Sequence, residues 1–411
     1  MSSRYRWVIL ATGAVGAGAF SALRMGLPSL GPALRGEYGL SLGEVGLAFA
    51  AVTGGVMVTL VPWGALTDRI GERPVMASGL AGCAAALVGA ALSTSYPALL
   101  AALLIAGMFG ASATGASGRA VMGWFARSER GFALGIRQMA LPLGGALASL
   151  TLPSLIDAHG LDAAFVALAG LCLTAAVASV AFMRDPPPAP DRRPALVRPP
   201  PTRDARLWRL GAGGALLVCA QASMLGFIVL FLHDARDVSA PTAAAALGAL
   251  QIVGALVRIV AGRRSDREGL RIAPMRRIAA RNTALLAAVG ALATGPGVLL
   301  YPLLAVAAIS TMSWNGLAFT AAAEISGHAR AGTAMSLQNT LISVGGVLAP
   351  SVFGVLVEAT SWTTAYVVLA LAPLAAFAVL SPREGEEDDR IAARALRARE
   401  TPEPLPVEAT T

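Results

Sequence analysis

The chain has 411 residues, of which 55% are hydrophobic and only 14% are charged, whereas an ordinary soluble domain is about 25% charged. So few charges cannot cover the surface of a soluble protein of this length, and they argue against that class. The net charge of +8 does not indicate nucleic-acid binding, because the basic residues fall between apolar runs and form no basic face. All 32 basic residues are arginine, which argues against a Walker A phosphate loop, a lysine Schiff base and an ATP-driven pump.

Apolar runs of spanning length fill most of the chain. Six occupy its first part, at 7–29, 42–65, 73–95, 97–123, 131–156 and 163–183. Six more follow at 207–232, 242–262, 278–297, 299–323, 332–357 and 362–381. Runs of about twenty residues are typical of helices that cross ~30 Å of hydrocarbon. We therefore expect an all-α integral membrane protein with twelve transmembrane helices.

A polar segment separates the two sets of runs. Residues 184–206 carry eight prolines and many charges, a composition that can neither pack into a core nor span a membrane. The sequence therefore predicts a first six-helix bundle at 1–183, a linker at 184–206, a second six-helix bundle at 207–381 and a tail at 382–411.

The arginines are distributed unequally between alternate loops. If the N-terminus is cytoplasmic, the outer loops keep only Arg35 and Arg236, and the remaining loop arginines lie inside. Short cytoplasmic loops are enriched in basic residues, so we expect this orientation in a plasma (cytoplasmic) membrane. An even number of spans then places both termini and the linker in the cytoplasm. The first run lacks a convincing signal-peptide cleavage site, so we expect it to be retained as a helix.

The two sets of runs also resemble each other. One pattern of glycines, an aspartate and arginines follows the second run and recurs after the eighth: Gly64, Asp68, Arg69, Gly71 and Arg73, then Gly262, Asp266, Arg267, Gly269 and Arg271. Transporters are commonly built from such repeats, with the solute site between them. We therefore expect two six-helix pseudo-repeats.

With these residues the chain resembles the major facilitator superfamily, whose loop between helices 2 and 3 carries the pattern Gly-x-x-x-Asp-Arg-x-Gly-x-Arg. The resemblance covers nearly all of residues 1–381 and implies the major facilitator fold. It also implies that this loop holds the halves together on the cytoplasmic side when the carrier faces outward. The gating residues expected are Gly64, Asp68, Arg69, Gly71, Arg73, Asp266 and Arg267, with Glu324 and Arg330 as partners across the loops. The alternative is that they are solvated loop charges.

Drug and proton antiporters of that superfamily carry two further signatures. One is an arginine in the first half of helix 4, where this chain has Ala106. The other is a Gly-Pro-x-x-Gly-Gly-like stretch in helix 5, of which this chain keeps Pro142, Gly144 and Gly145. Both departures disfavour multidrug efflux.

Four of the arginines within predicted spans are candidates for a functional role: Arg24, Arg119, Arg137 and Arg258. An arginine near the middle of a spanning helix costs about 2.5–3.5 kcal/mol on insertion scales, so each needs a function or an escape route. Arg119 and Arg137 lie within snorkelling distance of the cytoplasmic ends of their helices. Arg258 lies deeper, and Gln251 shares its side of the helix. We therefore take Arg258, Arg24, Arg119 and Gln251 as candidate solute-binding residues.

Three amide side chains in the second half are further candidates for solute binding: Gln221, Asn315 and Gln338. An alternative stays open for each, because a buried amide between transmembrane helices commonly serves as interhelical glue worth about 0.6 kcal/mol.

The segment around Arg258 resembles helix 8 of the monocarboxylate and cyanate-permease-like branch, in which an arginine is followed four residues later by a glycine, here Gly262. That branch also carries a basic residue in helix 1, close to the position of Arg24. Its acidic residue before the arginine and its proline after it are replaced by Gly254 and Ile259, which leaves proton coupling open. A guanidinium offers paired donors that match a carboxylate.

The function we expect is secondary active transport of a small organic anion by alternating access, coupled to protons or to exchange. Efflux of drugs or amphiphiles, transport of a neutral or cationic solute, and a transporter-like sensor remain alternatives. The cysteines lie in apolar runs and the histidines are scattered, and no catalytic motif occurs, so we expect no enzyme, no cofactor and no metal. The expected partners are a small solute and the lipid bilayer, with the protein a monomer.

Overall fold

The computed structural model describes residues 4–125, 129–184, 203–326 and 331–381, which are helical apart from short connections. The first half comprises α1 (Tyr5–Gly26), the 3-10 helix η1 (Leu27–Leu30), α2 (Gly31–Tyr38), α3 (Leu42–Ile70), α4 (Glu72–Ala91), α5 (Tyr96–Trp124), α6 (Arg130–His159) and α7 (Leu161–Phe182). The second half comprises α8 (Ala205–Arg236), α9 (Ala240–Glu268), α10 (Ile272–Ala291), α11 (Gly297–Thr311), α12 (Asn315–Ser326), α13 (Ala331–Ala359), α14 (Trp362–Leu369) and α15 (Leu371–Val379).

The described helices confirm the expected all-α membrane fold. Eleven helical segments are long and apolar enough to cross a membrane. The tenth and twelfth predicted spans each consist of two helices, α11 with α12 and α14 with α15. The short helix α2, in the loop after α1, was not predicted.

The remaining predicted span, α10, is not among the eleven apolar segments, and it carries Arg276, Arg277 and Arg281. The sequence placed this span at 278–297, which was wrong by several residues, since the helix runs from Ile272 to Ala291. All three arginines find partners within the second half, and Arg281 donates hydrogen bonds to Ser310 and Ser313. The guanidinium of Arg276 lies 4.3 Å from the ring centroid of Phe377, and Arg277 forms an ion pair with Glu268. These contacts let arginines typical of a loop remain inside a helix.

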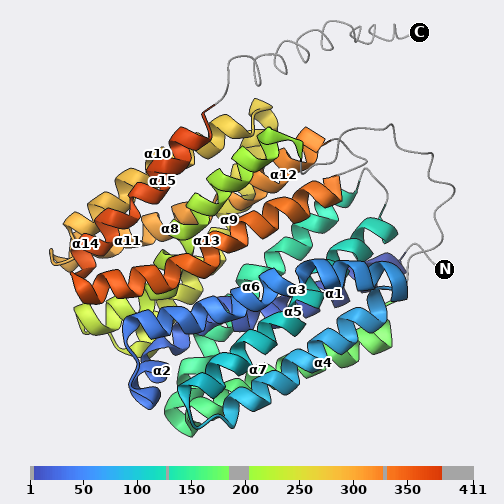
Figure 1. Ribbon diagram of the computed structural model, residues 1–411, viewed down its shortest axis with the longest axis horizontal. Coiled ribbons are helices and arrows are strands. Elements are labelled where there is room, and N and C mark those ends of the chain that lie inside the picture. The colour runs from blue at the N-terminus through green and yellow to red at the C-terminus, as the bar shows by residue number, and fades with distance from the viewer. Residues whose placement is uncertain (1–3, 126–128, 185–202, 327–330, 382–411) are drawn as a thin grey trace, which may run out of the picture.

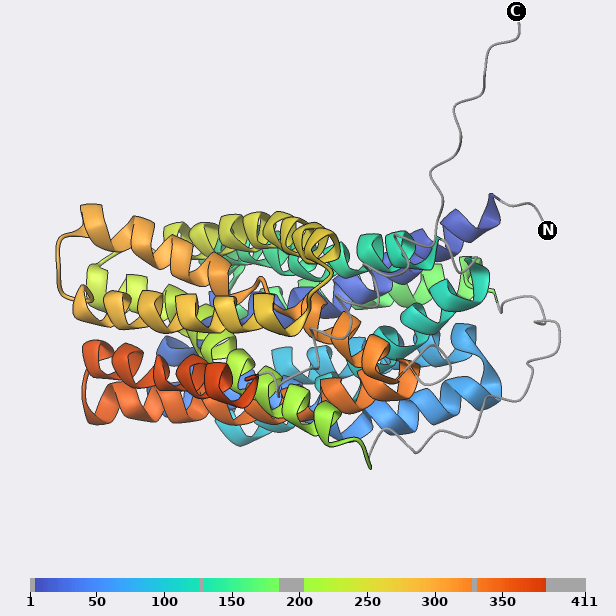
Figure 2. The same cartoon turned by 90° about the horizontal axis from the view of Figure 1, so that it is seen from above.

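The start of α1 and the end of α15 lie at the same end of the bundle (Figure 1). We call this end the termini side and the opposite end, which carries α2, the far side. The helices of both halves run roughly along one direction (Figure 2). The twelve predicted spans therefore form one bundle whose two ends face opposite surfaces of the membrane.

The halves contact each other mainly through two helix pairs, α3 with α13 and α6 with α9, and more narrowly where η1 and α2 meet α8 and η1 meets α9. On the far side α3 and α13 approach so closely that only glycine fits at the contact. A Cβ on Gly46 would lie 2.4 Å from the carbonyl oxygen of Pro350, and a Cβ on Gly354 would lie 2.3 Å from that of Leu42. Small residues permit such backbone contacts between membrane helices. The far side of the bundle is therefore closed between the halves.

Two turns of the first half have the same conformation. Gly71, between α3 and α4, and Gly160, between α6 and α7, both have φ 88° and ψ 171°. Glycine is favoured there because a Cβ disfavours positive φ. Gly269, which corresponds to Gly71 in the second half, also has a positive φ of 70°. Gly71 and Gly269 of the repeated pattern thus stand where the chain reverses, whereas Gly64 and Gly262 lie within α3 and α9.

Candidate functional site

The tenth span is interrupted within the membrane. Helix α11 ends at Thr311 and α12 begins at Asn315. At this break the Nε of Arg258 donates a hydrogen bond to the carbonyl oxygen of Met312, at 2.9 Å. Interrupted helices leave backbone carbonyls free for side chains or ligands, and in transporters they commonly mark solute sites.

Two candidate amides meet at the same break. The Nδ2 of Asn315 donates to the Oε1 of Gln221 in α8, at 3.0 Å, and Gln221 is buried. Beside them Trp314 is fully buried, and its indole nitrogen has no acceptor among the described residues. The structure thus brings Arg258, Gln221 and Asn315 to one level of the second half.

A second level lies farther toward the far side, where α9 touches α1. The Nε2 of Gln251 donates to the carbonyl oxygen of Met25 at 3.0 Å, and its own Oε1 is buried without a donor among the described residues. Arg24, the neighbour of Met25, is exposed. Gln251 precedes Arg258 by two helical turns, about 10 Å. Arg24 and Arg258 therefore stand at different depths along the contact between the halves.

Neither Arg24 nor Arg258 takes part in an ion pair of the described residues. Those pairs gather near the helix ends: Arg6 with Glu129, Arg35 with Asp234, Arg119 with Glu72, Arg206 with Asp204, Arg264 and Arg277 with Glu268, and Arg271 with Asp266 and Glu324. The deep part of the bundle thus holds positive charge that these carboxylates do not balance.

Other arginines and amides named from the sequence stay within one half. The Nε of Arg119 lies 3.1 Å from the Oε1 of Glu72, which is buried. Arg137 is buried and donates to the hydroxyl of Ser117, the amide oxygen of Gln138 and the carbonyl oxygen of Thr114, at 2.8, 2.8 and 2.6 Å.

Gln338 likewise joins helices of the second half, because its Nε2 donates to the carbonyl oxygen of Leu210 at 3.2 Å. In this conformation these side chains connect helices. For Gln338 this agrees with the alternative that a buried amide joins transmembrane helices. Whether any of them also binds solute stays a prediction.

The gating pattern of the first half lies on the termini side. Gly71 forms the turn into α4, and Arg69 and Arg73 are exposed. Among the described residues, a Cβ on Gly64 would meet nothing within 4 Å, so none of them makes a close helix contact there in this conformation. The side chain of Asp68 and the whole of Arg330 lie outside the described residues.

The corresponding pattern in the second half forms an ion-pair cluster. Arg271 lies 2.7 Å from Asp266 and 2.9 Å from Glu324. Partial burial lowers the pKa of Arg271, but the hydrogen bonds that its guanidinium donates to the carboxylates of Glu324 and Asp266 raise the pKa by more, so the net shift is upward. Arg267 is exposed. Glu324 thus pairs within its own half, whereas the resemblance implied a partner across the loops.

The far side carries polar contacts between the halves that the sequence did not predict. The backbone N–H of Leu42 donates to the Oε1 of Glu358 at 2.6 Å, and Arg35 of α2 pairs with Asp234 of α8. The sequence contained one indication of these contacts, because Arg35 is among the few arginines expected in an outer loop. With the bond from Gln251, these are three hydrogen bonds that join the halves among the described residues, and all three lie away from the termini side.

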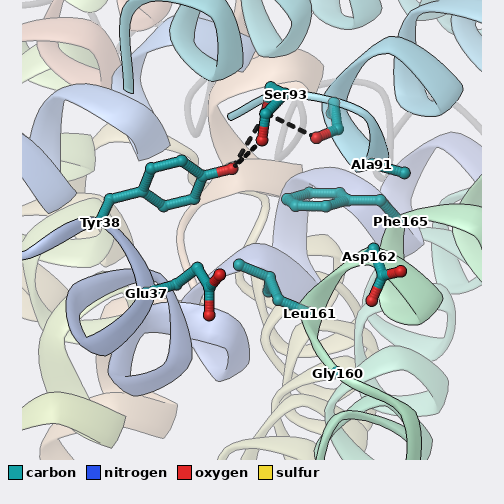
Figure 3. Close-up of a pocket in the computed structure, with 9 residues that line it drawn as sticks. Glu37, Tyr38, Ala91, Ser93, Gly160, Leu161, Asp162 and Phe165 are labelled. Carbon is teal, nitrogen blue, oxygen red and sulfur yellow. Dashed lines mark hydrogen bonds between the residues drawn. The ribbon is translucent and has the colours of Figure 1, made fainter. Parts of the chain in front are cut away.

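A separate pocket of about 270 Å³ lies within the first half on the far side (Figure 3). Its lining includes Glu37, Tyr38, Ser93, Asp162 and Phe165. The hydroxyl of Tyr38 donates to the carbonyl oxygen of Ser93 at 2.8 Å. The pocket is lined by residues of the first half alone, from α2, α4, α7 and the connections beside them, and by none of the candidate solute-binding residues, so it is not part of the candidate solute site.

The fold and the interrupted tenth span define a membrane carrier made of two helical halves. The model of the Major Facilitator Superfamily matches residues 10–350, and the chain belongs to this superfamily. It is 36% identical over 384 residues to the MFS-type transporter Rv2994 of Mycobacterium tuberculosis, a match that covers 92% of this chain and 85% of that protein. A shorter match, 30% identical over 166 residues, relates it to the probable sulfoacetate transporter SauU of Cupriavidus necator and covers 40% of this chain and 38% of that one.

Solved structures share the fold at low sequence identity. A bacterial homologue of the human lysosomal transporter Spinster, in an inward-facing and occupied conformation, has a TM-score of 0.73 at 16% identity and covers 98% of both chains. The human organic anion transporter MFSD10 (TETRAN) has a TM-score of 0.66 at 20% identity and covers 93% of this chain and 100% of that one. These likenesses confirm the major facilitator fold that the repeated pattern indicated.

Proposed function

We propose that this protein is a secondary active transporter of a small organic anion, with Arg258 as the main anion-binding residue. The observation that carries this proposal is the position of Arg258. Its guanidinium stands at the break in the tenth span, bonded through Nε to a backbone carbonyl and paired with no carboxylate of the described residues. The two terminal nitrogens are thereby left for a ligand, and a guanidinium binds carboxylate or sulfonate oxygens in pairs.

Arg24 and Gln251 would extend the site toward the far side. The exposed guanidinium of Arg24 would receive the anion when that side opens, and Arg258 would hold it at the break. The names of two similar proteins, a probable sulfoacetate transporter and an organic anion transporter, support a small anion. Gln221 and Asn315 would contact the uncharged part of the solute.

Transport would proceed by rocking of the two bundles, residues 1–183 and 207–381, joined by the linker. The termini side would face the cytoplasm, and the far side the exterior. The contacts of Leu42 with Glu358 and of Arg35 with Asp234 would then close the outer side in the conformation described here. On the cytoplasmic side the loop of Asp68 and Arg69 would close the opposite conformation.

Uptake into proteoliposomes tests the proposal. Labelled small carboxylates and sulfonates are compared with a cationic dye and a sugar, so that the efflux and neutral-solute alternatives are measured in parallel. Arg258→Gln should abolish anion uptake, and Arg258→Lys should lower its affinity about tenfold, because lysine keeps the charge but loses the paired donors. Arg263→Gln, an exposed arginine on the same helix, serves as the control. Wild-type anion uptake by Arg258→Gln would reject the anion site.

The orientation has its own test. A reporter that is active only in the cytoplasm should give signal when fused after Arg198 or Thr411 and none when inserted near Val238. The reverse pattern would overturn the orientation but leave the anion site standing.

A further inference from the structure

The membrane-facing side of α10 carries two arginines. The helix packs on α11, α12, α14 and α15 of the second half and lies at the periphery of the bundle next to α15 (Figure 1). Arg277, Ala280, Arg281 and Ala284 are exposed, and their spacing places them on one face of the helix. In a bilayer this face meets lipid.

Arg281 is the deeper of the two arginines. It follows Ile272, the first residue of the helix, by about 14 Å along the axis. Its Nε donates to the hydroxyl of Ser310 at 2.8 Å, and a terminal nitrogen donates to the hydroxyl of Ser313 at 3.2 Å. Hydroxyl groups accept these bonds but do not neutralise the charge. Arg281 takes part in no ion pair of the described residues.

Arg277 lies one turn closer to the termini side and shares its carboxylate partner. Glu268 of α9 pairs with Arg277 and also with Arg264, at 2.8 Å. The side chains of Arg277 and Arg264 are 54% and 73% exposed. One carboxylate therefore serves two guanidinium groups, and with Arg281 the edge between α9 and α10 carries excess positive charge.

Hydrocarbon offers no acceptor for the remaining guanidinium donors, and an unneutralised arginine at this depth costs about 2.5–3.5 kcal/mol on insertion scales. Arginine side chains relieve this cost by extending toward the headgroup region. Phosphate oxygens are strong acceptors for guanidinium groups. The charge and the position on the lipid-facing side therefore both fit the headgroup of an anionic lipid, and the small side chains of Ala280 and Ala284 leave room for its acyl chains.

We propose that the Arg277 and Arg281 face of α10 binds the phosphate group of an anionic phospholipid in the leaflet on the termini side. The phosphate lies between the two guanidinium groups, and the acyl chains lie along Ala280 and Ala284. Ser310 and Ser313, which hold Arg281, flank Met312, whose carbonyl binds Arg258. The bound lipid is therefore connected, through Arg281, to the same interrupted span that carries the candidate solute site.

The experiment titrates the purified full-length protein with phosphatidylglycerol or with phosphatidylcholine of the same chain length and measures the first bound lipid by native mass spectrometry. The wild type should bind phosphatidylglycerol at least tenfold more tightly, since a basic residue near the surface contributes about 1 kcal/mol, or about fivefold in affinity, toward anionic lipid. Arg277→Gln and Arg281→Gln should each reduce the preference about fivefold. Arg281→Lys should keep most of it. Arg4→Gln, an exposed arginine of the first half on the same side, is the matched control and should keep all of it.

Equal binding of the two lipids by the wild type would overturn the proposal. The proposal would also be overturned if Arg277→Gln and Arg281→Gln both kept the full preference for phosphatidylglycerol, or if Arg4→Gln lost as much of that preference as they do. Competition by millimolar inorganic phosphate would assign the face to a free anion and would also overturn it. If Arg281→Gln does not fold, Arg277→Gln and Arg281→Lys still decide the outcome.

Discussion

The carboxylate of Glu358, in the last turn of α13, accepts a hydrogen bond from the backbone N–H of Leu42, the first residue of α3, at 2.6 Å. The two residues belong to different halves and meet on the far side. The first N–H groups of a helix have no partner within the helix, and an anion placed there is stabilised by the helix dipole. One side chain thereby connects the two halves through the start of a helix.

The first prediction concerns this contact. Glu358→Gln should weaken closure of the far side, because an anion at a helix N-terminus contributes about 0.3–1 kcal/mol. The population open on that side should rise about two- to fivefold. The measurement is the rate at which an impermeant maleimide labels Thr53→Cys, a buried position of α3, in a variant whose three native cysteines are replaced. Glu37→Gln, an exposed carboxylate on the same side, should leave the rate unchanged, and an unchanged rate in Glu358→Gln would reject the contact as a closing element.

The second prediction tests the close contact of α3 with α13. Gly46→Leu should prevent closure of the far side, because a Cβ there would lie 2.4 Å from the carbonyl oxygen of Pro350. Labelling of Thr53→Cys should become fast, and transport should fall at least tenfold. Gly170→Leu is the control, because a Cβ on Gly170 meets nothing within 4 Å. Normal transport by Gly46→Leu would mean that this contact is not needed in the cycle.

The third prediction concerns the termini side. Asp68→Asn should slow transport several-fold while solute affinity stays within a few-fold of wild type, because a gating residue changes the balance between conformations and not the solute contacts. Initial uptake rates at several solute concentrations separate the two quantities. A full transport rate in Asp68→Asn would remove Asp68 from the mechanism.

The fourth prediction separates a structural arginine from a binding arginine. Arg137→Ala should lower the free energy of unfolding by about 1–3 kcal/mol, because three charge-assisted hydrogen bonds are lost within the first half. Thermal unfolding in detergent measures this change. The affinity for the transported anion should not change in the fraction that remains folded. A selective loss of affinity with normal stability would place Arg137 at the solute site.

The sequence by itself determined the membrane class, the number of spans and their pairing into repeats. These properties follow from local composition, because each span needs about twenty apolar residues and each turn of the repeated pattern needs a glycine with positive φ, as at Gly71 and Gly269. Local composition predicted the wrong bounds for α10, because the arginines of this helix have partners far away in the sequence. Phe377 and Ser310, which hold Arg276 and Arg281, could not be identified from the local pattern.

Only the tertiary structure decided which polar residues meet. The sequence singled out Arg258, Gln221 and Asn315 separately, and the fold brought them to one break, because α8, α9 and the tenth span pack side by side. It also decided that Glu358 meets Leu42. Both outcomes depend on contacts between residues distant along the chain. Such contacts are set by how helices pack, whereas the hydropathy that places a helix in the membrane acts on each helix alone.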